Sequence, residues 1–192
     1  AGLLAGDYDL IENPTGEDLL ALEGNSAYSY STMPSWRTIF LILDAGSDVA
    51  PGVTAGVGSN PLKDIRVRQA LSLSIDRDAI VDKLMGGNAT VASQFAPSYQ
   101  DGADSSMPDM AYDVDMARSL LAESGYSDSI TINLRMPTGK YQNGKRVGQA
   151  IAHYWSKIGI QVNLVAEPWS VFRKGRSARE LGVFMYGWGH PQ

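Results

Sequence analysis

Three apolar runs of strand length alternate with helical patterns in the last third of the chain, and this alternation most constrains the fold. The runs occupy residues 130–136, 160–166 and 182–188. Residues 143–158 repeat apolar side chains at helical spacing and end at Gly159, and a shorter segment at 169–181 leads to the last run. Strands that alternate with helices in this way form right-handed crossovers between parallel strands. The sequence therefore predicts an α/β fold with a βαβαβ unit at 130–188.

The earlier part of the chain predicts one further strand and several capped helices. Residues 38–43 form a continuous apolar run rich in β-branched and aromatic side chains, which is typical of a buried strand. Asp64, Asp76 and Asp113 each precede a helical pattern, where an aspartate caps the first free N–H groups. Residues 44–61 are rich in Gly, Ser, Ala, Asp and Pro without a period, so we expect a linker or lobe boundary there.

The predicted strand ends indicate a candidate site. Parallel strands present their carboxyl ends along one edge of the sheet, where open α/β sheets bind ligands. The residues delivered to that edge are Thr138 after the first strand, Glu167 and Trp169 after the second, and Trp188, Gly189 and His190 after the third. Indole rings offer large apolar contact while polar groups fix orientation, so we expect these residues to bind a substrate. The alternative is that Trp169 and Trp188 cap the core.

Composition and motifs narrow the function classes. The chain has 192 residues, a formal charge of −5 and no cysteine, which excludes disulfides and thiolate metal sites. The acidic balance disfavours a nucleic-acid partner, and no apolar run approaches the roughly 20 residues that cross a bilayer. Zinc needs three or four ligands, whereas His190 has only Glu167 as a visible companion, so no metal or cofactor is expected. No serine lies in a Gly-x-Ser-x-Gly elbow, and the chain is not expected to be an enzyme.

One run of residues is more specific than these patterns. Residues 60–71, NPLKDIRVRQAL, followed by Ile75-Asp76-Arg77, resemble the signature of bacterial extracellular solute-binding proteins of family 5, the peptide- and nickel-type receptors of ABC importers. Further matches follow in order along nearly the whole chain: AGDYD at 5–9, YD at 112–113, LLAESGY at 120–126, IGI at 158–160, Trp169, and GWG at 187–189.

The resemblance implies a two-lobed periplasmic-binding-protein fold of type II, of which this chain is a central fragment. Residues 1–52 would then form the C-terminal piece of the first lobe, 53–61 the inter-lobe linker and 62–192 a partial second lobe. Family members are periplasmic, or lipid-anchored on the outer face of the cytoplasmic membrane. They capture oligopeptides, dipeptides or similar small solutes by clamp closure and deliver them to an ABC permease, without catalysis.

The resemblance also implies that Trp188 lines the solute cavity. Many peptide-binding relatives carry an aspartate three residues after this tryptophan, which pairs with the amino terminus of the peptide. This sequence has Pro191 there, so it lacks that anchor at this position. Solutes other than peptides, such as sugars, nickel chelates and opines, are also taken by relatives.

Two other functions are compatible with the residues. A small α/β hydrolase or transferase would use Glu167 and His190 as a base pair. An interaction module would use the basic segment 173–179, which contains three arginines and a lysine. In a fragment, an unpaired sheet edge is also expected to favour self-association.

Overall fold

The computed structural model describes residues 2–12, 14, 16–33, 35–56, 60–97, 99–108, 110–127 and 129–189. Within these residues the body is built on one five-stranded sheet. Its strands are β1 (Thr38–Leu43), β2 (Val53–Thr54), β3 (Thr131–Pro137), β4 (Gln161–Glu167) and β5 (Val183–Trp188). β4 pairs with β3 along its whole length, so β2 and β5 share the other side of β3, and β1 lies beyond β5.

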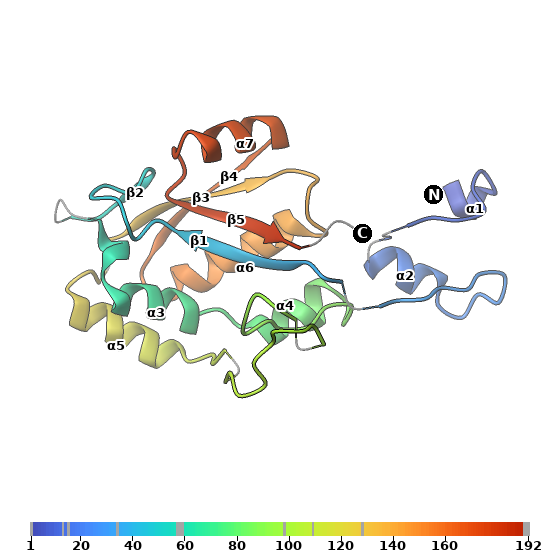
Figure 1. The fold of residues 1–192 in the computed structure, drawn as a ribbon, viewed down its shortest axis with the longest axis horizontal. Helices are drawn as coiled ribbons and strands as arrows, with labels where there is room; N and C mark the ends of the chain where they lie inside the picture. Colours follow the sequence, from blue (N-terminus) through green and yellow to red (C-terminus); the bar gives the residue numbers. More distant parts are fainter. Residues whose placement is uncertain are drawn as a thin grey trace.

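The predicted βαβαβ unit is confirmed. β3 runs parallel to both β4 and β5, and α6 (Gly144–Ser156) and α7 (Trp169–Ser177) connect the strands. Successive side chains of a strand point to opposite faces. Val183 and Met185 of β5 join the main core, to which α6 contributes, whereas Phe184 packs with Phe172 of α7. The two connecting helices therefore cover opposite faces of the sheet (Figure 1).

Three further helices lie on the α6 side: α3 (Ile65–Leu73), α4 (Arg77–Leu84) and α5 (Val114–Ser124). Each begins after a predicted capping aspartate, whose carboxylate accepts a backbone N–H: Asp64 from Arg66, Asp76 from Ala79, and Asp113 from Met116. Trp155 of α6 is fully buried and donates its indole N–H to the Leu71 carbonyl of α3 at 3.0 Å. This bond ties the helical layer to the βαβαβ unit.

The predicted strand at 38–43 is β1, and it departs from the parallel pattern. β1 runs antiparallel to β5, with Thr38 opposite Trp188 and Leu43 opposite Val183. The chain then returns to the sheet, since β2 pairs with β3 and the Pro51 carbonyl accepts the Gly182 N–H at 3.0 Å. Residues 38–54 therefore pack in one body with the βαβαβ unit. The predicted division into lobes at 53–61 concerns the whole protein and stays a prediction.

The N-terminal residues form an arm that carries two short helices, α1 (Gly2–Ala5) and α2 (Gly16–Leu22). Figure 1 shows this arm extending away from the body. Leu10 is 80% exposed, and neither of the two described core clusters includes a residue of the arm. One contact with the body is the hydrogen bond from the Gln142 side chain to the Pro14 carbonyl, 2.7 Å long. Among the described helices, none combines the length and apolar character needed to cross a membrane.

Candidate functional site

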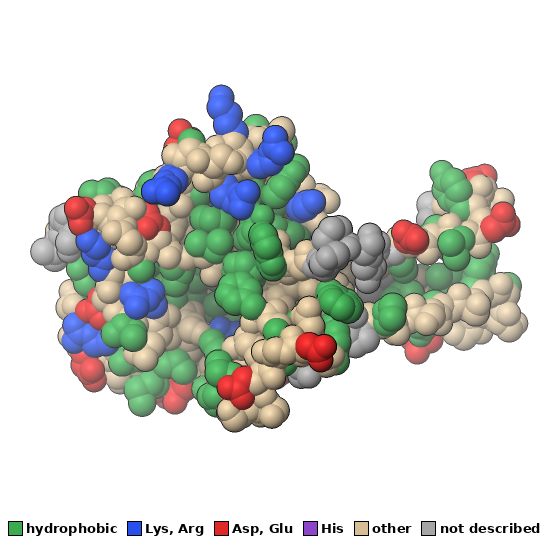
Figure 2. Space-filling model, in the orientation of Figure 1, with side chains coloured by type: hydrophobic (Ala, Val, Ile, Leu, Met, Phe, Trp, Pro, Cys, Tyr) green, Lys and Arg blue, Asp and Glu red, His purple; other side chains and the backbone are tan. Residues whose placement is uncertain are grey.

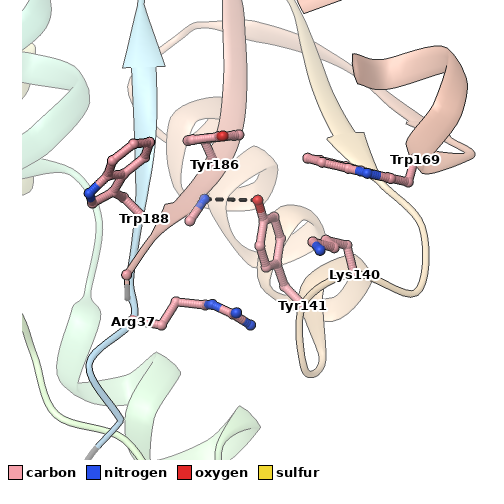
Figure 3. A pocket seen from close by; sticks show the side chains of 8 residues that line it. Arg37, Lys140, Tyr141, Trp169, Tyr186 and Trp188 are labelled. Carbon is pink, nitrogen blue, oxygen red and sulfur yellow. Dashed lines mark hydrogen bonds between the residues drawn. The ribbon is translucent and has the colours of Figure 1, made fainter. Parts of the chain in front are cut away.

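A pocket lies at the carboxyl edge of the sheet, where the predicted site was placed. It has a volume of about 200 Å³ and draws its walls from four segments: the entry to β1, the loop after β3, the start of α7 and the end of β5 (Figure 3). The lining residues are Arg37, Lys140, Tyr141, Trp169, Tyr186, Gly187, Trp188 and Gly189.

Three of the predicted site residues come together in this pocket. Trp188 ends β5 and keeps 66% of its surface exposed, so it is not sealed in the core. Trp169 is half-buried and stacks on Phe172 with the ring centres 5.7 Å apart. Both indoles and the backbone of Gly189 line the same hollow. That they contact a solute stays a prediction.

Glu167 and Thr138 lie at the same sheet edge but are absent from the pocket lining. Glu167 is buried and forms a two-pronged ion pair with Arg135, in which Nη2 lies 2.5 Å from Oε2 and Nε lies 3.2 Å from Oε1. Thr138 donates its hydroxyl and its backbone N–H to the Glu167 carbonyl, at 3.2 and 2.8 Å. In this arrangement the two residues fasten the ends of β3 and β4 together. His190 lies outside the described residues.

Five lining residues were not predicted: Arg37, Lys140, Tyr141, Tyr186 and Gly187. Arg37 reaches the site only because β1 pairs with β5, a contact that no local pattern indicates. Lys140 and Tyr141 lie in the loop that follows the first predicted strand, and that position was the signal available for them. The Gly187 N–H donates to the Tyr141 hydroxyl oxygen at 2.8 Å. Burial raises the pKa of Tyr141, so this phenol keeps its proton at neutral pH.

Two glycines allow the walls to close. A Cβ added to Gly189 would lie 2.6 Å from the Trp36 carbonyl oxygen, a backbone atom that cannot yield easily. A Cβ added to Gly187 would lie 2.6 Å from Cδ1 of Ile39 and 2.8 Å from Cε1 of Tyr141. Real Cβ contacts are longer than this, so Gly189 needs glycine for the close approach of the backbones, and a side chain at Gly187 would displace Ile39 or Tyr141.

The chemistry of the pocket is aromatic and cationic. The Lys140 ammonium lies 4.8 Å from the centre of the Trp169 ring, a cation–π contact. Within the described part of the chain, no group of three or more His, Asp or Glu side chains is arranged to hold a metal ion. The arrangement is therefore suited to holding a solute by ring contacts and hydrogen bonds.

Comparison with known proteins gives the pocket a family context. The model of the bacterial extracellular solute-binding proteins, family 5 Middle, matches residues 1–191. A dipeptide-binding protein of Escherichia coli is 31% identical over 146 residues, which cover 72% of this chain and 27% of that protein. Heme-binding protein A of Haemophilus influenzae is 29% identical over 191 residues, covering 98% of this chain and 33% of that protein.

Solved structures agree on the fold. A dipeptide-binding protein from Pseudoalteromonas sp. SM9913, in complex with Met-Leu, superimposes with a TM-score of 0.82 at 19% identity, covering 98% of this chain and 35% of that one. The murein tripeptide-binding protein of Escherichia coli gives 0.80 at 23% identity, covering 98% and 36%. The chain thus spans about a third or less of the length of these relatives. It belongs to the bacterial extracellular solute-binding proteins of family 5, whose fold is the two-lobed type II fold.

Proposed function

We propose that the full-length protein containing this chain is the solute-binding component of an ABC importer. It captures oligopeptides, dipeptides or similar small solutes outside the cytoplasm and delivers them to a membrane permease. The observation that carries the proposal is the aromatic pocket at the carboxyl edge of the sheet, in a chain of family 5. A peptide solute is favoured because several relatives are named as dipeptide-, tripeptide- or oligopeptide-binding proteins.

In the proposed mechanism, solute contacts made only in the closed form shift the equilibrium between open and closed lobes. Trp188, Trp169, Gly189 and His190 contact the solute from this lobe. Glu167 and Thr138 hold the sheet edge that carries these residues. The permease recognises and binds the closed form. The protein works in the periplasm, or attached by a lipid to the outer face of the cytoplasmic membrane.

The other two functions are less well supported. A hydrolase would need the Glu167 carboxylate as a base, but that group is buried against Arg135. Most of the basic segment 173–179 lies on α7, which ends at Ser177, and Figure 2 shows Lys and Arg side chains gathered at the top of the view. One of its members, Arg176, packs over the Tyr186 ring at 4.7 Å and so supports a pocket wall instead of facing a partner freely.

The test is a titration of the full-length protein with a panel of di- to pentapeptides. Binding is measured by calorimetry and by the change in tryptophan fluorescence. Trp188→Ala should weaken binding of the best peptide about ten-fold or more, because aromatic anchors in a binding site carry much of the affinity. Tyr112→Ala is the matched control, since Tyr112 is an exposed aromatic residue outside the pocket. Absence of binding across the panel, or equal affinities for the two variants, would contradict the proposal.

A further inference from the structure

A second pocket lies on the helical side of the sheet. It has a volume of about 460 Å³ and is formed by α3, the first turns of α5 and the loop that precedes α5 (Figure 1). Met107 and Met110 of the loop and Met116 of α5 are among its lining residues, so we call it the methionine pocket. It shares no lining residue with the pocket at the carboxyl edge of the sheet.

The methionine pocket gathers three of the seven methionines of the chain. Met107, Met110 and Met116 are 45%, 39% and 51% exposed, whereas Met136 and Met185 are buried in the main core. Core packing therefore does not account for the three pocket methionines, and exposed apolar side chains that gather in one place commonly mark a binding site. Because the chain has no cysteine, their thioethers are the sulfur donors available to a ligand here.

Hydrogen bonds fix the backbone that carries these side chains. The Met107 N–H donates to the Asp104 carbonyl at 3.2 Å, which closes a turn in the loop. The Asp113 N–H donates to the Leu73 carbonyl at the end of α3, 2.9 Å away, and the Asp113 carboxylate accepts the Met116 N–H at 2.8 Å. The methionines therefore reach the pocket from anchored positions on both sides of it.

The other groups in the lining limit what the pocket can bind. Among the described lining residues there is no Asp, Glu, His, Lys or Arg, and the Ser72 hydroxyl already accepts the Arg77 guanidinium at 2.9 Å. Calcium and magnesium take oxygen ligands, and zinc takes thiolate, imidazole or carboxylate, so these ions do not suit the donors present. A thioether is a soft and neutral ligand, and such ligands select Cu(I).

We propose that the methionine pocket binds a soft monovalent metal ion, Cu(I), through the thioether sulfurs of Met107, Met110 and Met116. Methionine has an unbranched side chain with three rotatable bonds, so the three sulfurs can move together around one ion inside this pocket. Neutral ligands leave the charge of the ion uncompensated, which costs less for a monovalent ion at a partly exposed site than for a divalent one. The site is independent of the proposed solute-binding function.

The test is a competition for Cu(I) between the full-length protein and bicinchoninate, a coloured Cu(I) chelator, in anaerobic buffer with ascorbate. The wild-type protein should withdraw one Cu(I) per chain from the chelator. Removing a group that only supports a metal ligand costs about ten- to hundred-fold in affinity, so Met107→Leu, Met110→Leu and Met116→Leu should each weaken binding at least about ten-fold. Leucine keeps the size and apolar character of methionine, so these variants remove the sulfur while preserving the packing.

Met33→Leu is the matched control, since Met33 is 78% exposed and lies outside the methionine pocket, in the segment before β1. It should bind Cu(I) as the wild type does, and an excess of magnesium should not displace the ion. Circular dichroism checks that each variant folds.

A wild-type protein that leaves Cu(I) on the chelator overturns the site. So does unchanged affinity in the variant that combines all three pocket substitutions, because the ion would then be bound elsewhere, and so does an equal loss in Met33→Leu. The pocket variants should bind the best peptide of the panel with wild-type affinity. Failure of peptide binding would therefore overturn the proposed function alone, and failure of Cu(I) binding would overturn this inference alone.

Discussion

The ion pair between Arg135 and Glu167 gives the Glu167 carboxylate a structural role in place of a catalytic one, and this role can be tested. The two side chains are 27% and 10% exposed, so the pair is largely withdrawn from water. Glu167→Gln leaves the Arg135 cation without its anion. Breaking a buried pair costs about 3–5 kcal/mol. Because Arg135 keeps some contact with solvent and glutamine retains one acceptor, we expect a loss of about 2 kcal/mol in the free energy of unfolding.

The assay is urea unfolding of the full-length protein, with hydrogen exchange of β3 and β4 amides reporting on this edge of the sheet. Arg135→Met combined with Glu167→Leu is the matched control, since replacing both partners by apolar groups of similar size is expected to leave stability unchanged or to raise it by about 1–4 kcal/mol. Wild-type exchange in Glu167→Gln would refute the reasoning. So would a double variant whose loss equals the sum of the two single losses, because the partners would then be uncoupled.

Two further perturbations follow from the geometry. Gly187→Ala places a methyl group 2.8 Å from the Tyr141 ring, so we expect a displaced tyrosine and an affinity for the best peptide about ten-fold lower, measured by calorimetry. Gly46→Ala, where a Cβ meets nothing closer than 3.8 Å, should bind as the wild type does, and equal affinities for both variants would contradict the packing argument. The Arg66 guanidinium, by hydrogen bonding, holds the pKa of Asp64 below its ordinary 3.8. A lowered pKa stabilises the fold above the ordinary value, and that contribution is lost as the pH falls below it. Urea midpoints measured from about pH 6 down to pH 3 should therefore fall more steeply for the wild type than for Asp64→Asn, and parallel profiles would count against the pairing.

Local patterns were enough to predict most of the elements. The strands at 131–137, 161–167 and 183–188 lie within one residue of their predicted bounds. Short continuous apolar runs bounded by turn residues are typical of buried strands, so their length and ends predict the bounds. The capping aspartates were equally predictable from the sequence, since each accepts a hydrogen bond from an N–H two or three residues away. The family signature at 60–71 identified the chain, and the family model covers nearly all of it.

The candidate site was only partly predictable. The crossover rule delivered Trp169, Trp188 and Gly189 to one edge, and all three line the pocket. The same rule placed Glu167 and Thr138 at this edge. It does not predict which side chains at the strand ends form bonds with neighbouring residues. The parallel register sets Pro137 opposite Glu167. Arg135 lies two residues earlier on the same face and forms an ion pair with the Glu167 carboxylate.

By itself the sequence determined the alternation of strands and helices, the helix starts, the family and the edge at which a site would form. All of these depend on residues close together in the chain or on the fixed hand of the crossover. Only the tertiary structure decided the charge of the pocket. Thr38 pairs with Trp188 across 150 positions, and this antiparallel contact carries Arg37 to the hollow where Lys140 already lies. Such a pairing is stabilised by packing between distant segments, which no local period records.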